Sequence, residues 1–289
     1  MFSLIIPTYN NIEYLKLCLK SIHRNSKYKH EIIIHINEGS DGTLDFVKKN
    51  NYKFTFSEKN IGLCSSVNSA ALMSTTQFIL YSHDDMYFCP GWDEALNNEI
   101  NDLNTNLFYL SSTMIEQKSG HIQIDCGDNP ANFKEEFLLR NFNNDSYYDF
   151  QGSHWAPHLI HKTIWNKIGG FSEEFNPGDG SDPDLNMKLW QEKVRIFKGI
   201  SKFRVYHFGS VVLRKKIKRN NGTKTFLLKW GITPTFFVKY YLRGGTFKKG
   251  KILNNVYDGP LREPIINVAY IIQLIICKIK LLYFKSIRF

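Results

Sequence analysis

The residues with the clearest capacity for chemistry are His83, Asp84 and Asp85, which follow an apolar run at 77–82 that predicts a buried strand. Two adjacent acids at the end of such a strand are costly unless a cation or hydrogen-bond donors meet them. Ligands of open α/β sheets bind beyond the carboxyl ends of the strands. The segment therefore predicts a divalent metal with a phosphate-bearing ligand, although acidic turns and helix caps use the same residue types.

The elements that must position these residues alternate between strand and helix. The patterns predict strands at 2–6, 31–36, 53–56 and 77–82, with helices over 12–22, 43–50 and 63–74 between them. This alternation predicts an α/β fold with a parallel sheet and helices on both faces. Right-handed crossovers place the turns after the strands at one edge of the sheet. We therefore expect loops 7–10, 37–41 and 83–87 to converge there.

The second half of the chain is less regular. The predicted elements are strands at 107–110, 121–124 and 201–207 and helices at 160–168 and 184–192. The last helix has Pro183 at a favoured first-turn position.

Composition limits the class of protein. The chain has 289 residues, 43% of them hydrophobic, and a net charge of +10 that is concentrated in 195–289. Such a charge attracts nucleic acid, anionic lipid or phosphorylated substrates. The five cysteines are widely spaced, which argues against a disulfide framework and predicts a reducing compartment. The N-terminus does not have the pattern of a signal peptide, and the chain contains no run of 18 apolar residues.

Seven segments in order, from Leu4 to about Gly209, resemble family 2 glycosyltransferases with the GT-A fold. They are Ile5-Ile-Pro-Thr-Tyr-Asn10, Glu31–Ile34 with Glu38–Thr43, Asn60-Ile-Gly62 with Asn68, His83–Asp85 with Pro90–Trp92, Gly169–Phe175, Ser181–Leu185 and Tyr206–Ser210. The resemblance implies a Rossmann-like, mostly parallel central sheet with helices on both faces. We expect a nucleotide-sugar-binding half at 1–105, an acceptor-binding half at 106–212 and a basic C-terminal helical extension at 213–289.

The same resemblance implies a nucleotide pocket on the first three loops. Pro7, Thr8 and Tyr9 correspond to the loop that holds the base, where Tyr9 offers a ring for stacking. Asn37 and Glu38 stand where the family usually has paired aspartates. Because an amide both donates and accepts, whereas a carboxylate only accepts, this difference leaves the identity of the base open.

Asn60 begins the turn before the third helix, whose N-terminus favours an anion and whose small residues fit close to a nucleotide or to the sheet. Farther along, the basic run 214–219 fits either a loop that closes on a diphosphate or a solvated surface.

The metal assignment follows the family's D-x-D position, where His83 replaces the first acid. Asp85 corresponds to the metal-ligating acid, and Asp84 to a neighbour that contacts ribose or a metal-bound water. His207 corresponds to a late ligand found in some similar enzymes, or to a structural histidine at a strand end. The implied cofactor is Mn²⁺ or Mg²⁺, which favours oxygen ligands together with the donor diphosphate.

Asp182 corresponds to the acid on the acceptor side of the family's site, with Ser181 in place of its usual glutamate. Inversion at an anomeric carbon needs a base for the acceptor proton, and we assign Asp182 that role. Asp184 fits loop orientation or helix capping better. Both acids would also stabilise a helix N-terminus.

The tail at 265–289 has its polar residues within an arc of about 160° on a helical wheel, and the rest is almost wholly apolar. This pattern fits a helix in a membrane interface, one docked on a partner chain, or one packed on the core.

The chain is thus predicted to be an inverting, metal-assisted hexosyltransferase in the cytoplasm or at the inner face of a membrane. Its donor would be a nucleotide-sugar, with UDP as the expected nucleotide, and its acceptor a hydroxyl on a glycan or lipid-linked glycan. A non-catalytic glycan-binding protein and a nucleotidyltransferase are the alternatives. Nucleic acid is not an expected partner, because the chain has no recognised nucleic-acid-binding module.

Overall fold

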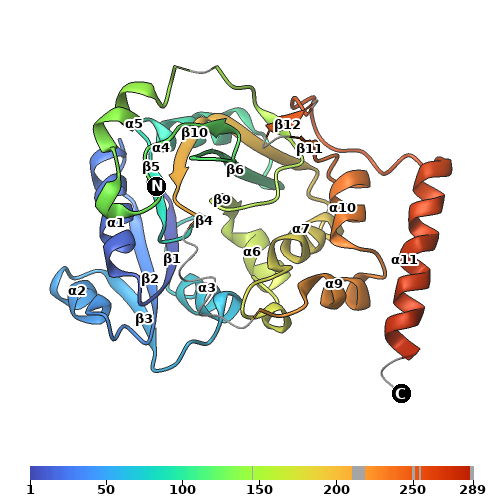
Figure 1. Ribbon diagram of the computed structural model, residues 1–289, viewed down its shortest axis with the longest axis horizontal. Coiled ribbons are helices and arrows are strands. Elements are labelled where there is room, and N and C mark those ends of the chain that lie inside the picture. The colour runs from blue at the N-terminus through green and yellow to red at the C-terminus, as the bar shows by residue number, and fades with distance from the viewer. Residues whose placement is uncertain (145, 210–218, 249–250, 254, 287–289) are drawn as a thin grey trace.

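A computed structural model describes residues 1–144, 146–209, 219–248, 251–253 and 255–286 (Figure 1). The described chain forms an α/β fold around one large mixed sheet. Most of the basic run 214–219 lies outside the described residues.

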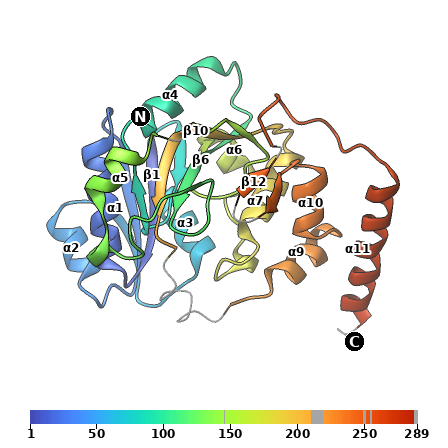
Figure 2. The same cartoon turned by 45° about the horizontal axis from the view of Figure 1, so that its top comes forward.

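The first half folds in the predicted order. Its elements are β1 (Ser3–Tyr9), α1 (Ile12–Asn25), β2 (Glu31–Asn37), α2 (Thr43–Lys49), β3 (Lys53–Ser57), α3 (Leu63–Ala71) and β4 (Phe78–Tyr81). The four strands are parallel, and α1 and α3 lie on opposite sides of them in both views (Figures 1 and 2). Residues 3–8 of β1 are all buried, as expected for a strand covered on both faces.

The strand order reverses at β1, because β2 pairs with one side of it and β4 with the other. Such a reversal opens a crevice at the carboxyl ends of the two strands, where ligands of α/β proteins bind. Thr8 near the end of β1 and Asp84 after β4 both lie at this point.

The second half adds antiparallel pairings that the sequence patterns did not reveal. It comprises β5 (Met86–Phe88), α4 (Trp92–Asp102), β6 (Phe108–Glu116), β7 (Ile122–Gln123), a 3₁₀ turn (Pro130–Asn132), α5 (Glu135–Asn141), β8 (Phe150–Gln151), β9 (His158–His161), α6 (Lys162–Ile168), a second 3₁₀ turn (Glu173–Phe175), α7 (Ser181–Gln191) and β10 (Ile196–His207). The prediction of a helix from 160 was wrong at its start. His158–His161 instead forms β9, antiparallel to β4 and β6, and the helix begins at Lys162. Short apolar runs fit either element until tertiary pairing decides.

The strands of the two halves form one sheet with the order β3-β2-β1-β4-β9-β6-β10-β5. Two short strands, β7 and β8, pair with β6 and β10 at its side.

The C-terminal part contains α9 (Gly222–Trp230), α10 (Pro234–Tyr240), a hairpin of β11 (Thr246–Lys248) and β12 (Lys251–Leu253), and α11 (Val268–Ser286). Helices α9 and α10 contact α7, while α11 packs on α9 and α10 at the edge of the molecule (Figure 1). Within the described ranges, no helix combines the length and apolarity needed to cross a bilayer.

Candidate active site

The three loops predicted to converge are joined by side-chain hydrogen bonds. Thr8 Oγ1 donates to Asp84 Oδ2 at 2.7 Å, which links the loops after β1 and β4. Asn10 Nδ2 donates to Glu38 Oε2 at 3.1 Å, and the Ser40 amide donates to Asn10 Oδ1 at 2.9 Å, which links the loops after β1 and β2. The carboxyl ends of β1, β2 and β4 therefore form one connected rim.

Sheet pairing brings His207 to this rim from far along the chain. The last residues of β10 pair antiparallel with β5, so His207 lies opposite Met86, the residue after Asp85. The amide of Phe208 then donates to the carbonyl oxygen of Asp85 at 3.1 Å. The strand that ends at His207 thus fixes it against the acidic turn.

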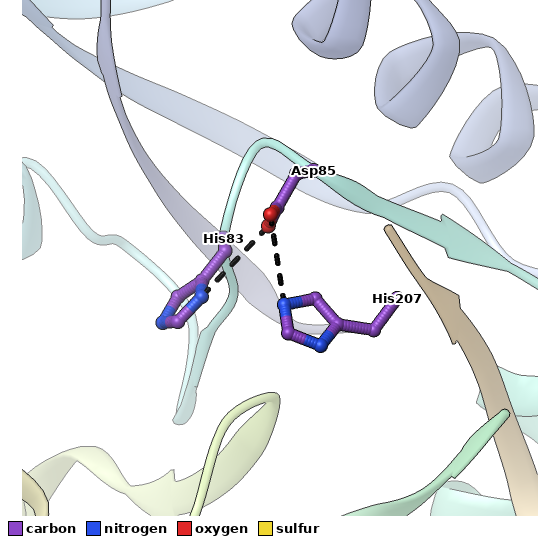
Figure 3. A group of neighbouring side chains, drawn as sticks. All are labelled: His83, Asp85 and His207. Carbon is purple, nitrogen blue, oxygen red and sulfur yellow. Dashed lines mark ion pairs between the residues drawn. The ribbon is translucent and has the colours of Figure 1, made fainter. Parts of the chain in front are cut away.

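His83, Asp85 and His207 form a cluster in which one ligand atom from each residue lies within 4.8 Å of the others. The two imidazoles point toward the Asp85 carboxylate from different sides (Figure 3). His83 Nδ1 is 3.9 Å from Oδ1, and His207 Nε2 is 3.6 Å from Oδ2. Asp85 and His207 are buried, while the side chain of His83 is 37% exposed, which leaves the cluster open on one side.

Glu116, at the end of β6, orients His207. Its Oε1 is 2.7 Å from His207 Nδ1, and β6 runs parallel to β10, so the two strand ends meet. Burial opposes ionisation of Glu116, but the hydrogen bond from His207 outweighs it and lowers the pKa of that carboxyl. An ionised carboxylate only accepts hydrogen bonds, so Nδ1 carries the hydrogen and Nε2 faces Asp85. Nothing in the sequence pattern pointed to Glu116, because its role depends on strand pairing.

The cluster is electrostatically matched to a cation. Burial lowers the pKa of His207, but the nearby carboxylates of Asp85 and Glu116 outweigh this effect and raise it to about 10. Burial and then the charge of Asp85 raise the pKa of Asp84 to about 7. Positive charge is therefore favoured beside the two adjacent carboxyls, Asp84 and Asp85. Either the proton of His207 or a metal ion bound to that imidazole can supply this charge, so the two compete for the histidine.

The donor set fits a divalent transition metal. Nε2 of His207 is buried and makes no hydrogen bond within the described chain, although it faces Asp85, as a ligand atom does. Imidazole nitrogens suit transition metals, and carboxylates suit Mg²⁺ and Mn²⁺. Two imidazoles with one carboxylate therefore fit Mn²⁺ better than Mg²⁺. His83, which replaces an acid of the sequence pattern, becomes a candidate ligand.

The predicted nucleotide residues occupy different positions in the rim. Burial, and then the charge and hydrogen bond of Glu38, raise the pKa of Tyr9, so these two side chains are neighbours. Both are half-buried, and Glu38 adopts a left-handed φ of 62°. Pro7 is buried within β1 and paired with His35 of β2.

Asn37 connects β2 to α3 through side-chain hydrogen bonds. It is buried, its Nδ2 donates to Ser66 Oγ at 2.9 Å, and its Oδ1 accepts from the Ile61 amide at 3.0 Å. These bonds attach the end of β2 to α3 and the turn before it. Direct contact between Asn37 and a nucleotide stays a prediction.

The N-terminus of α3 has a capping group from a distant segment of the chain. Asn176 Oδ1 accepts from the Cys64 amide at 2.9 Å, and Asn176 Nδ2 donates to Ser65 Oγ at 2.7 Å. A Cβ on Gly62 would collide with the side chain of Asn176, so glycine is needed for this close approach. Asn60 closes the preceding turn by accepting from the Gly62 amide at 2.9 Å.

Asp182 and Asp184, on the first turn of α7, have different environments. Asp184 is fully buried, and its Oδ1 accepts from Trp230 Nε1 at 2.8 Å and pairs with Lys229 Nζ at 2.9 Å, so it attaches α9 to α7. Asp182 is half-buried, and burial raises its pKa to about 7. Burial raises the pKa of Tyr81, at the end of β4, and the charge of Asp182 raises it further. Asp182 is therefore close enough to the end of β4, which the His83–Asp85 turn follows, to act electrostatically on Tyr81.

Comparisons with known proteins agree on the class of this fold. The model of the family described as glycosyl transferase family 2 matches residues 3–162. An uncharacterized glycosyltransferase of Rickettsia prowazekii (strain Madrid E) is 27% identical over 234 residues, which cover 78% of this chain and 67% of the relative.

Two solved structures show a similar fold at low sequence identity. S. aureus TarS 1–349 has a TM-score of 0.55 and 18% identity over 71% of this chain and 60% of its own, and TarS was also solved with UDP and with UDP-GlcNAc. A mannosyltransferase of Pyrobaculum calidifontis, in complex with GDP-Man and Mn²⁺, has a TM-score of 0.50 and 14% identity over 79% of this chain. This chain spans about three fifths of the length of these solved chains.

Proposed function

This chain belongs to glycosyl transferase family 2 and is a glycosyltransferase with a GT-A fold, and we propose that it moves a hexose from a nucleotide-diphosphate donor to a hydroxyl acceptor with inversion. The observation that carries the proposal is the buried Asp85 between two imidazoles at the reversal of strand order. A metal-chelating cluster at that point suits a diphosphate ligand.

The donor would bind along the rim formed by the three loops. Tyr9 and Glu38 flank the place of the base, Thr8 positions Asp84 toward the ribose, and the metal cluster meets the diphosphate. We propose a UDP-sugar as donor, a choice supported by the TarS complexes, whereas the mannosyltransferase binds GDP-Man. A glycan or lipid-linked glycan is the proposed acceptor. The five cysteines, all free and buried, suit the reducing environment of a cytoplasmic enzyme.

The residues that would hold the metal are His83, Asp85 and His207. A bound Mn²⁺ or Mg²⁺ would offset the charge that develops on the nucleoside diphosphate as its bond to the sugar breaks. Glu116 keeps the His207 ring in its ligating orientation.

Asp182 would act as general base. Its carboxylate takes the proton of the acceptor hydroxyl while that oxygen forms a bond to the anomeric carbon. The bond between the anomeric carbon and the diphosphate oxygen breaks, and its electron pair leaves with the nucleoside diphosphate. A pKa of about 7 suits this task, because it keeps the base partly ionised at neutral pH without weakening it.

A donor-hydrolysis screen over nucleotide-sugars with Mn²⁺ or Mg²⁺ tests the proposal, using wild type, Asp85→Asn, Asp182→Asn and the control Asp45→Asn. Asp45 is an exposed acid on α2, so its substitution should leave turnover unchanged. We expect metal-dependent hydrolysis that is lost with Asp85→Asn and falls at least about a hundredfold with Asp182→Asn. Metal-independent turnover, unchanged in both variants, would refute the mechanism. Formation of pyrophosphate from a nucleoside triphosphate and a sugar 1-phosphate, supplied in a separate reaction, would indicate a nucleotidyltransferase. Glycan binding without any turnover would indicate a binding protein.

A further inference from the structure

Helix α11 is attached to the rest of the protein along one narrow face. Tyr270 and Cys277 are buried there, and the Tyr270 ring lies 5.0 Å from that of Phe236 and 5.1 Å from that of Tyr240. The half-buried residues Leu274, Leu281 and Phe284 extend this face over the whole helix. Truncating α11 would therefore expose the apolar surface of α10, so point substitutions in the full chain give the cleaner experiment.

The opposite face of α11 is apolar and exposed. At 100° per residue, its members lie roughly opposite the attached face. They are Val268, Ile271, Ile272, Ile275, Ile276, Ile279, Leu282 and Tyr283, with exposures from 38% to 73%. Just before the helix, Ile265 and Ile266 are 81% and 71% exposed. A continuous exposed strip of this kind is unusual and marks an interaction surface. We name these ten residues the outer strip.

Lysines border the outer strip on both sides. Lys278 and Lys285 lie on one side of the helix and Lys280 on the other, in each case between the outer strip and the attached face. All three lysines are exposed. Residues 265–289 contain no Asp or Glu. The helix thus presents an apolar surface within a border of positive charge only.

We propose that α11 lies flat in the interface of an anionic membrane leaflet, with the outer strip among the acyl chains and the three lysines at the phosphate level. Exposed apolar residues supply the insertion, and lysine stems reach back to the headgroups. The helix is 19 residues long, which is about 28 Å at 1.5 Å per residue, and its attached face keeps it parallel to the protein surface. Its edge position leaves the outer strip accessible (Figures 1 and 2).

Charge makes a second copy of this chain a poorer occupant. Contact between two outer strips related by a two-fold axis would bring two all-positive borders together, with no acid on either helix to pair with them. A phosphate-rich leaflet offers the missing negative charge and an apolar interior at once.

Vesicle flotation of the full chain tests the proposal, without donor or acceptor, so its outcome is independent of glycosyl transfer. Vesicles of phosphatidylcholine alone are compared with vesicles that also contain phosphatidylglycerol. The variants are Ile275→Glu with Ile279→Glu in the outer strip, Lys278→Glu with Lys280→Glu in its border, and the control Leu72→Glu. Leu72 is 88% exposed and far from α11 in the sequence, so it matches the change of an exposed apolar residue to glutamate.

We expect the wild type and Leu72→Glu to float with anionic vesicles and much less with phosphatidylcholine alone. The isoleucine pair should lower the apparent affinity at least about tenfold, and each lysine should account for about fivefold. Unchanged circular dichroism and melting temperature establish that the variants are folded. Failure of the wild type to float, or equal flotation of the isoleucine pair, would overturn the proposal. A dimer that the isoleucine pair of substitutions dissociates, together with no flotation, would assign the strip to a second copy instead.

Discussion

Replacing Asp182 by Asn should abolish transfer and at the same time stabilise the protein. Burial raises the pKa of Asp182 from an ordinary 3.8 to about 7, so the folded protein holds this proton more tightly than the unfolded chain. The stability of the wild type therefore falls as pH rises from about 4 to about 7, and the loss is complete above pH 7. Asn carries no charge, so the variant does not lose this stability as the pH rises.

The magnitude follows from the size of the pKa shift. About three pKa units at 1.36 kcal/mol each give an upper limit of about 4 kcal/mol. Because the side chain is only half-buried, solvent screening lowers this limit, and we expect about 2 kcal/mol at pH 8. For a chain of this size, such a gain raises the melting temperature by about 4 °C. At pH 5 the gain should be less than half as large.

Asp184→Asn is the matched control, because it makes the same change two residues away. Asp184 holds Trp230 and Lys229, so its replacement should cost about 1–3 kcal/mol. Calorimetric melting of the wild type and both variants at pH 5 and pH 8, with donor hydrolysis at pH 8, measures all of these effects. A gain for Asp182→Asn that is equal at both pH values would refute the pKa argument, and retained hydrolysis would refute its role as base.

The other predictions concern the metal cluster and the loops around it. Glu116→Gln should weaken Mn²⁺ binding about 10–100-fold by calorimetric titration, since His207 loses its orienting carboxylate, and an unchanged affinity would exclude that role. Wild type should bind Mn²⁺ more tightly than Mg²⁺, and His83→Asn should reduce this difference in affinity, because one imidazole ligand is lost. Tighter binding of Mg²⁺ by the wild type would contradict the assignment of two imidazoles and one carboxylate as ligands. At saturating Mn²⁺, kcat/KM should fall as pH drops below about 7, because Asp182 becomes protonated, and a flat profile from pH 6 to 8 would argue against it. Asn176→Ala should cost about 1 kcal/mol in urea unfolding, because α3 loses its cap, whereas Asn176→Asp keeps the acceptor oxygen.

The first half of the fold could be predicted because each of its elements is determined locally. Parallel strands buried on both faces leave apolar runs, and the turns after them carry polar residues that cap or bind. The convergence of Thr8, Glu38 and Asp84 then follows from the handedness of the crossovers. The second half depends on pairings between distant segments. His158–His161 has no period that separates strand from helix, and it is a strand because β4 and β6 each offer an edge.

The tail shows a different limit of sequence patterns. A helical wheel separates the lysines from the apolar arc, but it does not reveal that Tyr270 and Cys277, between the lysine flanks, anchor the helix. The arc that would be expected to pack on the core is the one that faces outward. Only the positions of α9 and α10 decide this, because they supply the partner surface.

His83 shows how structure changes the meaning of a departure from a motif. In sequence, a histidine in place of an acid suggests a weaker metal site, because one negative charge is lost. In the fold, its Nδ1 lies 3.9 Å from Asp85 Oδ1, on the open side of the cluster. A divalent ion held by two neutral imidazoles and one ionised carboxylate would keep a net charge of +1. That remaining positive charge is available to attract the donor diphosphate. A histidine at position 83, in place of an acid, therefore weakens binding of the metal alone but favours binding of the metal together with the anionic donor.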